Sequence, residues 1–570
     1  MNKAAAKALI TILAAAAFFA APRALDAGDG QPQAAPANPA FLQYLQTPRP
    51  QRVAAVSAAP GTALGWAPSP LPVLSGPLTP PGPQVSYAAT YDLRTHGKVS
   101  AVRDQGSCGS CWAHAALASM ESYFLAGESL DLSEDHLDQN SGFDFGSCNG
   151  GNDAMTAAYM TRWNGPALEG SSVTVKHAQN ILMMSARSGP TDNDRIKAAI
   201  LAYGAVTAAF YWASGYYNST NHSYYANISS TSYSSNHEVV IVGWNDDYPK
   251  GNFGSVPVSQ PSGNGAFICK NSWDTSWGES GYFYVSYYDG VFGRDYYTSV
   301  FTGEGVKTYT RLYGYDELGW ERDYGYGSTT GWYSAIFTAA GNESLKGVGF
   351  YTTDAADYTV YVYTGVTAGQ PRSGTLAYTG TGTVGSPGHY TVPIGFFPVN
   401  TGDRFSVVVK AVNASSVYPI PMEANWPGFS GGAAASGNSY ISSDGATWTG
   451  MPAAALGITP TDVNVQAYGI TQPPEGVVEM TDNLFRPVSS PGVKCKVNLT
   501  IFAPGSVTVK VYTTNGAFVK TIYNGPQAYG AANYFWDGRT ESGAMAASGL
   551  YLINVKGPNT NITEKVVLIK

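Results

Sequence analysis

The spacing of apolar positions separates a mixed region from two regions of strands. Within residues 86–303, apolar residues recur at three- and four-residue steps over residues 110–126 and 192–203, which predicts two helices. Strand-like apolar runs follow at residues 205–210, 238–244, 266–270 and 282–288. Helices first and strands later predict an α+β domain over residues 86–303.

From about residue 305 the helical periodicity stops. Residues 357–365 and 404–412 alternate or are β-branched, and they lie between Gly-rich turns. This pattern is typical of a β-sandwich, which we place at residues 305–470. A Pro-rich linker at residues 471–476 then separates this sandwich from the end of the chain.

The last stretch of the chain, residues 477–570, carries a clear hairpin pattern. Over residues 506–522 two alternating strands flank the pair Asn515-Gly516. Asn-Gly favours the tight turn that matches the twist of paired strands. We therefore expect a small Ig-like sandwich here.

The N-terminus has the layout of a secretory signal. Two lysines precede an uncharged apolar run over residues 8–21, and small residues follow, with cleavage expected after Ala21 or Ala27. The run is shorter than the roughly 20 residues that span a membrane, and a buried Ala-rich helix is the alternative. We predict a signal peptide at residues 1–27 and no membrane span in the mature chain.

Residues 28–85 are rich in Pro and Ala and show little periodicity, apart from one short helix expected at residues 41–46. Such a composition is typical of a linker, and a pro-segment is the other interpretation.

Composition narrows the class of protein. The chain has 570 residues, with Lys+Arg 32 against Asp+Glu 40 and a net charge of −8. A net negative chain without a basic block is a poor nucleic-acid binder. Its 65 Gly, 39 Tyr and 35 Pro favour turn-rich β structure, and the low charged fraction of 13% excludes a coiled coil.

The cysteine count is odd, so at least one thiol is free; the five are Cys108, Cys111, Cys148, Cys269 and Cys495. A zinc site at the first pair needs two further ligands, and no second Cys-x-x-Cys exists. A thioredoxin-like site needs a βαβ context that is absent here. We therefore expect no metal, and we interpret the last two cysteines as buried free thiols.

Residues 105–113 form a Gly/Ser-rich loop that runs into a predicted helix, with Cys111 at the helix N-terminus. The helix dipole favours a thiolate there and lowers the thiol pKa. The free amide can also donate to a developing oxyanion, with Gln105 as a second donor. A thiolate nucleophile further needs a residue that protonates the leaving group.

This loop resembles the active-site signature of papain-like cysteine peptidases. The resemblance continues over about 200 residues at 91–94, 102–105, 132–134, 148–151, 236–239, 270–273 and 277–282. It implies a papain-like α+β fold with a helical half and a β-barrel-like half. It also implies hydrolysis of peptide bonds with no metal or organic cofactor.

The resemblance implies a role for each matching residue. Cys111 is the nucleophile and forms a thiolate–imidazolium couple with His237. Asn271 orients the imidazole ring, and Trp273 shields that contact from water. Gln105 and the backbone N–H of the nucleophile form the oxyanion hole.

The same resemblance implies the surroundings of the site. Gly150 and Gly151 offer backbone for pairing with an extended substrate, and Trp277 belongs to the substrate-binding residues. Cys108 and Cys148 match the disulfide that braces the active-site loop.

Two features depart from the family pattern. The long helical inhibitory pro-segment is missing, and residues 153–205 diverge, so no specificity pocket is assigned. His114 lies one helical turn after Cys111 and competes for the role of base, but we interpret it as core or pocket wall.

The strand-rich regions carry resemblances of their own. Residues 313–320 and 325–328 resemble the start of a lectin-like sandwich that follows papain-like domains in bacterial secreted proteins. A glycan or another cell-surface ligand is its candidate partner, although its aromatic residues also suit ordinary packing. Residues 536–539 and 548–551 resemble the Ig-like module of a flagellar hook-capping protein, which indicates spacing, anchoring or export.

Together these patterns predict a secreted or cell-surface bacterial cysteine endopeptidase, monomeric, acting on protein or peptide substrates through a thioester. Two alternatives stay open. A surface adhesin would use the same fold only as a scaffold, and a transpeptidase would pass the acyl group to an amine.

Overall fold

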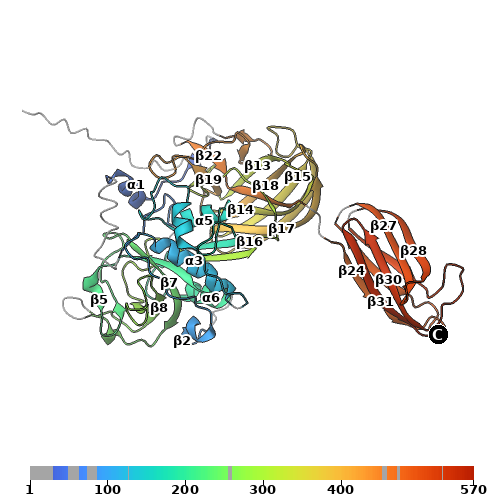
Figure 1. Cartoon of the computed structure of the whole chain (residues 1–570). Helices are drawn as coiled ribbons and strands as arrows, with labels where there is room; N and C mark the ends of the chain where they lie inside the picture. The colour runs from blue at the N-terminus through green and yellow to red at the C-terminus, as the bar shows by residue number, and fades with distance from the viewer. Residues whose placement is uncertain are drawn as a thin grey trace, which may run out of the picture.

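The computed structural model describes residues 30–48, 63–73, 86–125, 127–254, 260–451, 459–471, 475–502, 504–528 and 530–570. The predicted signal peptide lies outside these residues. Figure 1 shows an α+β region and a central β-sandwich packed together, with a C-terminal β-sandwich set apart from both. We call residues 30–48 and 63–73 the leading segment.

Among the described residues, the helical half of the α+β region contains four helices: α3 (Cys111–Phe124), α4 (Glu134–Gln139), α5 (Asp153–Thr161) and α6 (Asp194–Tyr203). Ser133 and Asn152 accept backbone N–H groups of the first turns of α4 and α5, which fixes where these helices start. The two helices predicted from periodicity are confirmed as α3 and α6. Short 3-10 turns lie at Leu93–His96, Ser214–Tyr216 and Lys250–Asn252.

The barrel-like half is a seven-stranded sheet in the order β2 (Thr90–Asp92), β7 (His237–Asn245), β8 (Ala266–Lys270), β9 (Tyr282–Ser286), β6 (Ser223–Tyr224) and β5 (Tyr217–Asn218), with β4 (Val206–Phe210) paired to β7. The four predicted strands are confirmed here. Strands β4 and β8 are buried along their whole length, as is β7 up to its last residue, which explains their uninterrupted apolar runs.

A second sheet joins the α+β region to the central sandwich. Its order is β10 (Thr298–Gly305), β3 (Lys176–Met184), β17 (Gly388–Val399), β14 (Glu343–Thr352), β23 (Val465–Ile470) and β11 (Arg311–Tyr313). The joint is the antiparallel pairing of β3 with β17, where Ile181 lies opposite His389. One apolar core also crosses this joint, since Trp112, Leu318 and Trp426 belong to the same buried cluster. The two regions are therefore continuous in both sheet and core.

Two further sheets complete the central sandwich. One has the order β16 (Thr375–Val384), β15 (Ala356–Thr364), β18 (Arg404–Asn413), β13 (Thr330–Thr338), β20 (Ser439–Ser442) and β21 (Thr449–Gly450). The other has the order β1 (Gln33–Ala34), β12 (Arg322–Gly325), β19 (Ile420–Ala424) and β22 (Pro460–Val463). The predicted β-sandwich is confirmed.

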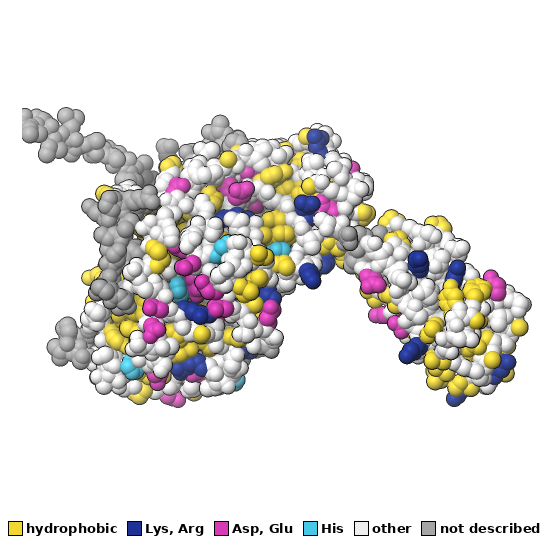
Figure 2. Space-filling view, in the orientation of Figure 1, with side chains coloured by type: hydrophobic (Ala, Val, Ile, Leu, Met, Phe, Trp, Pro, Cys, Tyr) yellow, Lys and Arg dark blue, Asp and Glu magenta, His cyan; other side chains and the backbone are white. Residues whose placement is uncertain are grey.

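The C-terminal sandwich packs a three-stranded sheet against a five-stranded one. The strands are β24 (Val477–Thr481), β26 (Cys495–Ile501) and β29 (Gly530–Trp536), then β25 (Leu484–Phe485), β31 (Thr560–Leu568), β30 (Gly549–Gly557), β27 (Gly505–Thr513) and β28 (Phe518–Gln527). The predicted hairpin is confirmed as β27–β28, with Gly516 at φ +85°. This sandwich has its own core and touches the central one where Phe502 meets Phe396, 4.4 Å between ring centres. Figure 2 shows apolar side chains gathered on its visible face.

The leading segment spans both packed regions. Its helix α1 (Pro39–Gln46), predicted at residues 41–46, starts at Asn38, whose side chain accepts the Ala40 N–H at 3.0 Å. Strand β1 pairs with β12 of the central sandwich, whereas residues 63–73 run along the α+β region. Among the described residues, no helix is both long and apolar enough to cross a membrane.

Candidate active site

Cys111 is the first residue of helix α3 and is fully buried. The loop before it is braced by the disulfide between Cys108 and Cys148, whose Cα atoms are 4.5 Å apart. The pairing implied by the resemblance is thus present in the structure. Cys269 and Cys495 are buried free thiols, as predicted.

His237 opens strand β7, and its Nε2 lies 2.9 Å from Oδ1 of Asn271, which follows strand β8. An amide oxygen only accepts, so Nε2 carries the proton and Nδ1 keeps a lone pair. The Trp273 ring stacks on the imidazole, 4.6 Å between centres and 19° between planes. Nδ1 has no partner among the described residues, which leaves it available to a neighbouring thiol.

The nucleophile and this strand come together at the start of β7. The backbone N–H of Glu238, next to His237, approaches the Cys111 thiol, as do the N–H groups at the start of α3. Their partial positive charge is the kind of environment that stabilises a thiolate.

Burial nevertheless dominates the charge state of the site. It raises the pKa of Cys111 far above its ordinary value, and the nearby Glu238 carboxyl raises it further. It also lowers the pKa of His237 to about 4, against the opposing effect of the Asn271 hydrogen bond. The sequence predicted a lowered thiol pKa from the helix start. The amides there do lower the thiol pKa, but in this covered state the loss of water outweighs them, because burial disfavours both charges. The covered pair is a neutral thiol beside a neutral imidazole.

Gln105 lies beside the same loop and is almost completely buried. Its Oε1 accepts a hydrogen bond from Ser272 at 2.6 Å, and its Nε2 donates to the Cys108 carbonyl at 2.8 Å. These two bonds fix the orientation of the amide and leave its second N–H unused. That N–H is the donor that an oxyanion would need.

Gly150 and Gly151 lie where only glycine fits. Gly150 has φ +95°, and a Cβ there would come within 2.9 Å of the Gly65 carbonyl oxygen. A Cβ on Gly151 would lie 2.4 Å from the Trp112 ring. The backbone is therefore open to a second chain at this edge.

The leading segment occupies that edge. Gly65 and Trp66 lie beside Gly151, which donates its N–H to the Gly65 carbonyl and accepts from the Ala67 N–H, both at 2.9 Å. The amides of Gly65 and Trp66 also approach the Asn236 carbonyl, at 3.2 Å each.

The segment continues past the shielding tryptophan. The indole N–H of Trp273 donates to the Ala63 carbonyl at 3.2 Å. Residues 63–67 thus lie across the groove between Gly151 and Trp273 and exclude water from Cys111. The sequence left residues 28–85 as a linker or pro-segment, and their course through this groove was not predicted.

Trp277, expected among the substrate-binding residues, is part of an aromatic wall. Its ring lies 5.1 Å from that of Trp273 at 88° and stacks on Tyr217 at 5.0 Å. The wall holds Trp273 against the imidazole. In this state Trp277 supports the position of Trp273.

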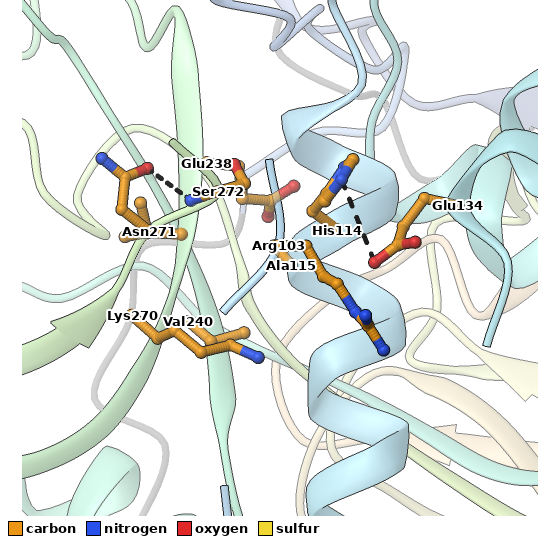
Figure 3. A pocket seen from close by; sticks show the side chains of 10 residues that line it. Arg103, His114, Ala115, Glu134, Glu238, Val240, Lys270, Asn271 and Ser272 are labelled. Carbon is orange, nitrogen blue, oxygen red and sulfur yellow. Dashed lines mark hydrogen bonds and ion pairs between the residues drawn. The ribbon is translucent and has the colours of Figure 1, made fainter. Parts of the chain in front are cut away.

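His114 lines a small pocket behind the nucleophile, as expected for a pocket-wall residue. Figure 3 shows it on helix α3, paired with Glu134 at 3.9 Å, while Lys270 and Asn271 come from the opposite sheet. Burial lowers the pKa of Lys270 to about 8, although the carboxyl of Glu121 opposes this. The contact between His114 and Glu134 joins helix α3 to helix α4.

One group of possible metal ligands occurs among the described residues: Cys108, Asp138 and Cys148. Both cysteine sulfurs are bonded to each other, so neither is available as a thiolate. We therefore assign no metal here.

Three residues of the site were missed by sequence reasoning: Asp153, Asn236 and Glu238. Asn236 and Glu238 flank the imidazole residue, and Asp153 follows the glycine pair. Their proximity to recognised motifs was a usable signal, but which side chains are buried in the groove depends on the packing of α5 against β4 and β7.

The comparisons with known proteins agree with this geometry. Residues 87–295 match the family model described as papain family cysteine protease, residues 312–469 a lectin like domain, and residues 489–561 an FlgD Ig-like domain. The resemblance to the papain family thus extends over residues 87–295. The predicted fold class, papain-like followed by two all-β sandwiches, is confirmed.

The curated relatives match only the papain-like part. A cysteine protease of Blomia tropicalis is 27% identical over 224 residues, which are 35% of this chain and 61% of the relative. Cysteine proteinase 1 of Entamoeba histolytica is 32% identical over 209 residues, 34% of this chain and 61% of the relative. The chain thus spans about three-fifths of the length of these relatives.

Two solved structures share the arrangement of the first two domains. One is the cysteine protease and lectin-like domains of Cwp84, a surface layer associated protein of Clostridium difficile. It is 24% identical, covers 78% of this chain and 99% of its own, and has a TM-score of 0.64. Cwp84 after propeptide cleavage is 23% identical, covers 68% and 100%, and has a TM-score of 0.58. These likenesses concern the fold alone.

Proposed function

We propose that this protein is a cysteine endopeptidase made as a latent precursor. Cys111 attacks the carbonyl carbon of a peptide bond, and His237 holds the proton that it then delivers to the leaving amine. The acyl group stays on sulfur as a thioester until water, activated by the same imidazole, releases it. Gln105 and the Cys111 backbone N–H stabilise the oxyanion at both steps.

The observation that carries the proposal is the polarity of the imidazole. The hydrogen bond from His237 to Asn271 fixes the proton on Nε2, and the stacked Trp273 keeps water from that bond. Nδ1 is thereby directed to the thiol as an acceptor. An imidazole held in this tautomer is what a general base beside a thiol requires.

Latency follows from the course of the leading segment. Residues 63–67 fill the groove by backbone hydrogen bonds to Gly151 and Asn236 and remove water from the reacting pair. Without water, both partners become neutral, so the thiol loses its nucleophilic form. Removal of the segment rehydrates the groove and restores the thiolate–imidazolium couple.

The first experiment is cleavage of unfolded casein under a reducing thiol, after the leading segment has been cut at a protease site inserted within residues 74–85. We expect cleavage by the processed protein and none by Cys111→Ala. Cys269→Ala is the matched control, because it removes another buried free thiol that has no part in the site. Equal cleavage by wild type and Cys111→Ala, or none by either with the segment removed, would contradict the proposal.

We also infer that the protein acts at the cell surface. The related Cwp84 is described as a surface layer associated protein, and the first residues of this chain have the pattern of an export signal. Fractionation of expressing cells should then place the chain in the envelope or the medium. Recovery in the cytoplasm with residues 1–27 intact would contradict this inference.

A further inference from the structure

Two acidic side chains lie buried beneath the leading segment, on either side of the catalytic groove. Asp153 is the first residue of α5 and follows Gly151 closely in sequence. Glu238 comes directly after His237 on β7. Their exposed fractions are 0% and 1%. Neither belongs to the reacting set, and burial of two carboxyl groups so close together is costly unless a partner compensates it.

Among the described residues, the carboxyl groups of this pair are surrounded only by neutral hydroxyl groups and by each other. Asp153 Oδ2 accepts a hydrogen bond from Thr207 at 2.9 Å. Ser299 and Glu238 also lie within hydrogen-bonding reach of Asp153, and Thr207 lies within reach of Glu238. The group is therefore rich in acceptor oxygens and holds no cation.

No cation of the described chain balances these charges, since no ion pair includes either residue. Burial raises the pKa of Asp153 to about 6. It raises the pKa of Glu238 well above its ordinary value, and the adjoining Asp153 carboxyl raises it further. Such a pair gains most from a positive partner that enters from outside.

The leading segment covers the pair without supplying that partner. The Trp66 ring lies edge-on to Tyr296, 4.8 Å between centres, and Ser69 approaches the same tyrosine. Residues 63–73 contain no charged side chain. The segment thus places an apolar lid over an acidic floor, at the end of the groove where Gly151 pairs with an incoming backbone.

We propose that Asp153 and Glu238 form a specificity pocket for the lysine or arginine side chain of a substrate, at the residue whose backbone pairs next to Gly151. This pocket rests on the proposed peptidase function and names its substrate class. A guanidinium has five N–H donors, which match the clustered carboxyl and hydroxyl oxygens. A leucine in the same place leaves the two carboxyl groups without a cation, and such mismatches give large discrimination.

The test is a pair of peptide libraries that differ only in Arg or Leu at each of three positions on both sides of the cleaved bond. For the processed protein we expect one position at which kcat/KM for Arg exceeds that for Leu by about 100-fold. In the double variant Asp153→Asn, Glu238→Gln we expect this ratio to fall at least 30-fold. Glu128→Gln, which removes a half-exposed carboxylate that pairs with Lys176, should keep the ratio.

Direct binding separates this inference from the proposed function. Processed Cys111→Ala should bind the Arg peptide at least 10-fold more tightly than the Leu peptide, whether or not the wild type is catalytic. If the wild type cleaves casein but its kcat/KM ratio of Arg to Leu is near one at every position, the specificity pocket is refuted and the proposed peptidase function is retained. If casein is not cleaved, equal binding of the two peptides to Cys111→Ala overturns the pocket, and tighter binding of Arg supports it. If the double variant does not fold, the specificity pocket is tested by the wild-type ratio and by the ratios of the single variants Asp153→Asn and Glu238→Gln.

Discussion

The two parts of the leading segment bind the rest of the chain through different kinds of interaction. Residues 63–67 lie in the groove and bind almost entirely through backbone N–H and C=O groups. Residues 33–46 bind the central sandwich through strand β1 and through Phe41, which is fully buried. The Phe41 ring lies edge-on to Trp426 at 5.2 Å and to Phe429 at 5.0 Å.

We infer from this difference how residues 63–67 can block the groove although their own contacts with it are weak. Any extended peptide, including a substrate, can form the backbone hydrogen bonds in the groove, so these give little advantage over a competitor. Burial of a phenylalanine side chain contributes about 2–3 kcal/mol and is specific to this chain. The two parts are tied where the Asn38 side chain donates to the Ser69 carbonyl at 3.1 Å. We therefore expect the central sandwich to take part in the proposed latency.

The largest effect should come from Gly65→Ala, which disrupts the contacts of residues 63–67 with the groove and leaves those of residues 33–46 in place. A Cβ at this position would lie 2.3 Å from the Gly109 carbonyl oxygen, which is backbone and cannot yield. We expect the unprocessed variant to cleave casein at least 100-fold faster than the unprocessed wild type. Gly215→Ala, where a Cβ meets nothing within 4 Å, is the control. If the uncut variant cleaved casein as slowly as the uncut wild type, residues 63–67 would not be what inhibits the precursor.

Phe41→Ala tests the anchoring part. Loss of a buried phenylalanine costs about 3 kcal/mol or more, which corresponds to a roughly 100-fold rise in the open fraction of the precursor. The rate of Cys111 alkylation in the uncut protein measures that fraction. Leu42→Ala on the same helix is the matched control, because Leu42 is 40% exposed. Equal alkylation rates in the two variants would refute a role of the central sandwich in latency.

Asp153→Asn tests the effect of the buried Asp153 charge, beneath the leading segment, on the stability of the fold. The folded pKa of about 6 exceeds the ordinary 3.8, so this carboxyl favours the folded state below pH 4 and loses that contribution as pH rises through 6. The loss amounts to about 3 kcal/mol at most. Denaturation of the Cys111→Ala precursor at pH 4.5 and pH 7 should show the variant gaining stability over its parent at the higher pH.

The control for this prediction has the opposite sign. The pKa of Asp192 is lowered by its hydrogen bonds to Ser188 and by Arg195, which outweigh burial. Asp192→Asn should therefore lose stability by a similar amount at pH 4.5 and pH 7, since both lie above the ordinary pKa of 3.8, and the loss should fade only at lower pH. If both variants shifted in the same direction, the buried charge of Asp153 would not be the cause.

The smallest effect should follow removal of the C-terminal sandwich after residue 471. It has its own core and meets the central sandwich through the contact between Phe502 and Phe396. We expect casein cleavage and the latency of the uncut form to change less than about twofold, since distant, independent parts act additively. A large change in either rate would show a coupling through this contact.

Much of the fold could be predicted because each local signal agreed with the packing. Helix α3 follows from its 3–4 periodicity, and strands β7 and β8 follow from their apolar runs. Strand β3 was missed, since its sequence KHAQNILMM mixes polar and apolar residues without alternation, and its pairing with β17 is a long-range contact. Local pattern carries no information about such a partner.

For the site, motif order identified Cys111, His237 and Asn271, and the structure brings the last two into hydrogen-bond contact. The charge state could not be predicted, because burial depends on residues 63–67, which have no periodic signal. The acidic floor was missed for the same reason. From sequence alone, a carboxyl such as Glu238 is expected at the surface, because acidic side chains are rarely buried. Only the structure shows that this one is buried.

The most direct test of the account is alkylation of the wild-type protein by iodoacetamide before and after the leading segment is removed, with the labelled residue mapped by mass spectrometry. We predict that the precursor stays unlabelled under conditions in which the processed protein is labelled rapidly at Cys111, while Cys269 and Cys495 remain unmodified in both. Labelling of Cys111 at the same rate in the two forms, or no labelling of it in the processed form, would contradict a covered cysteine nucleophile.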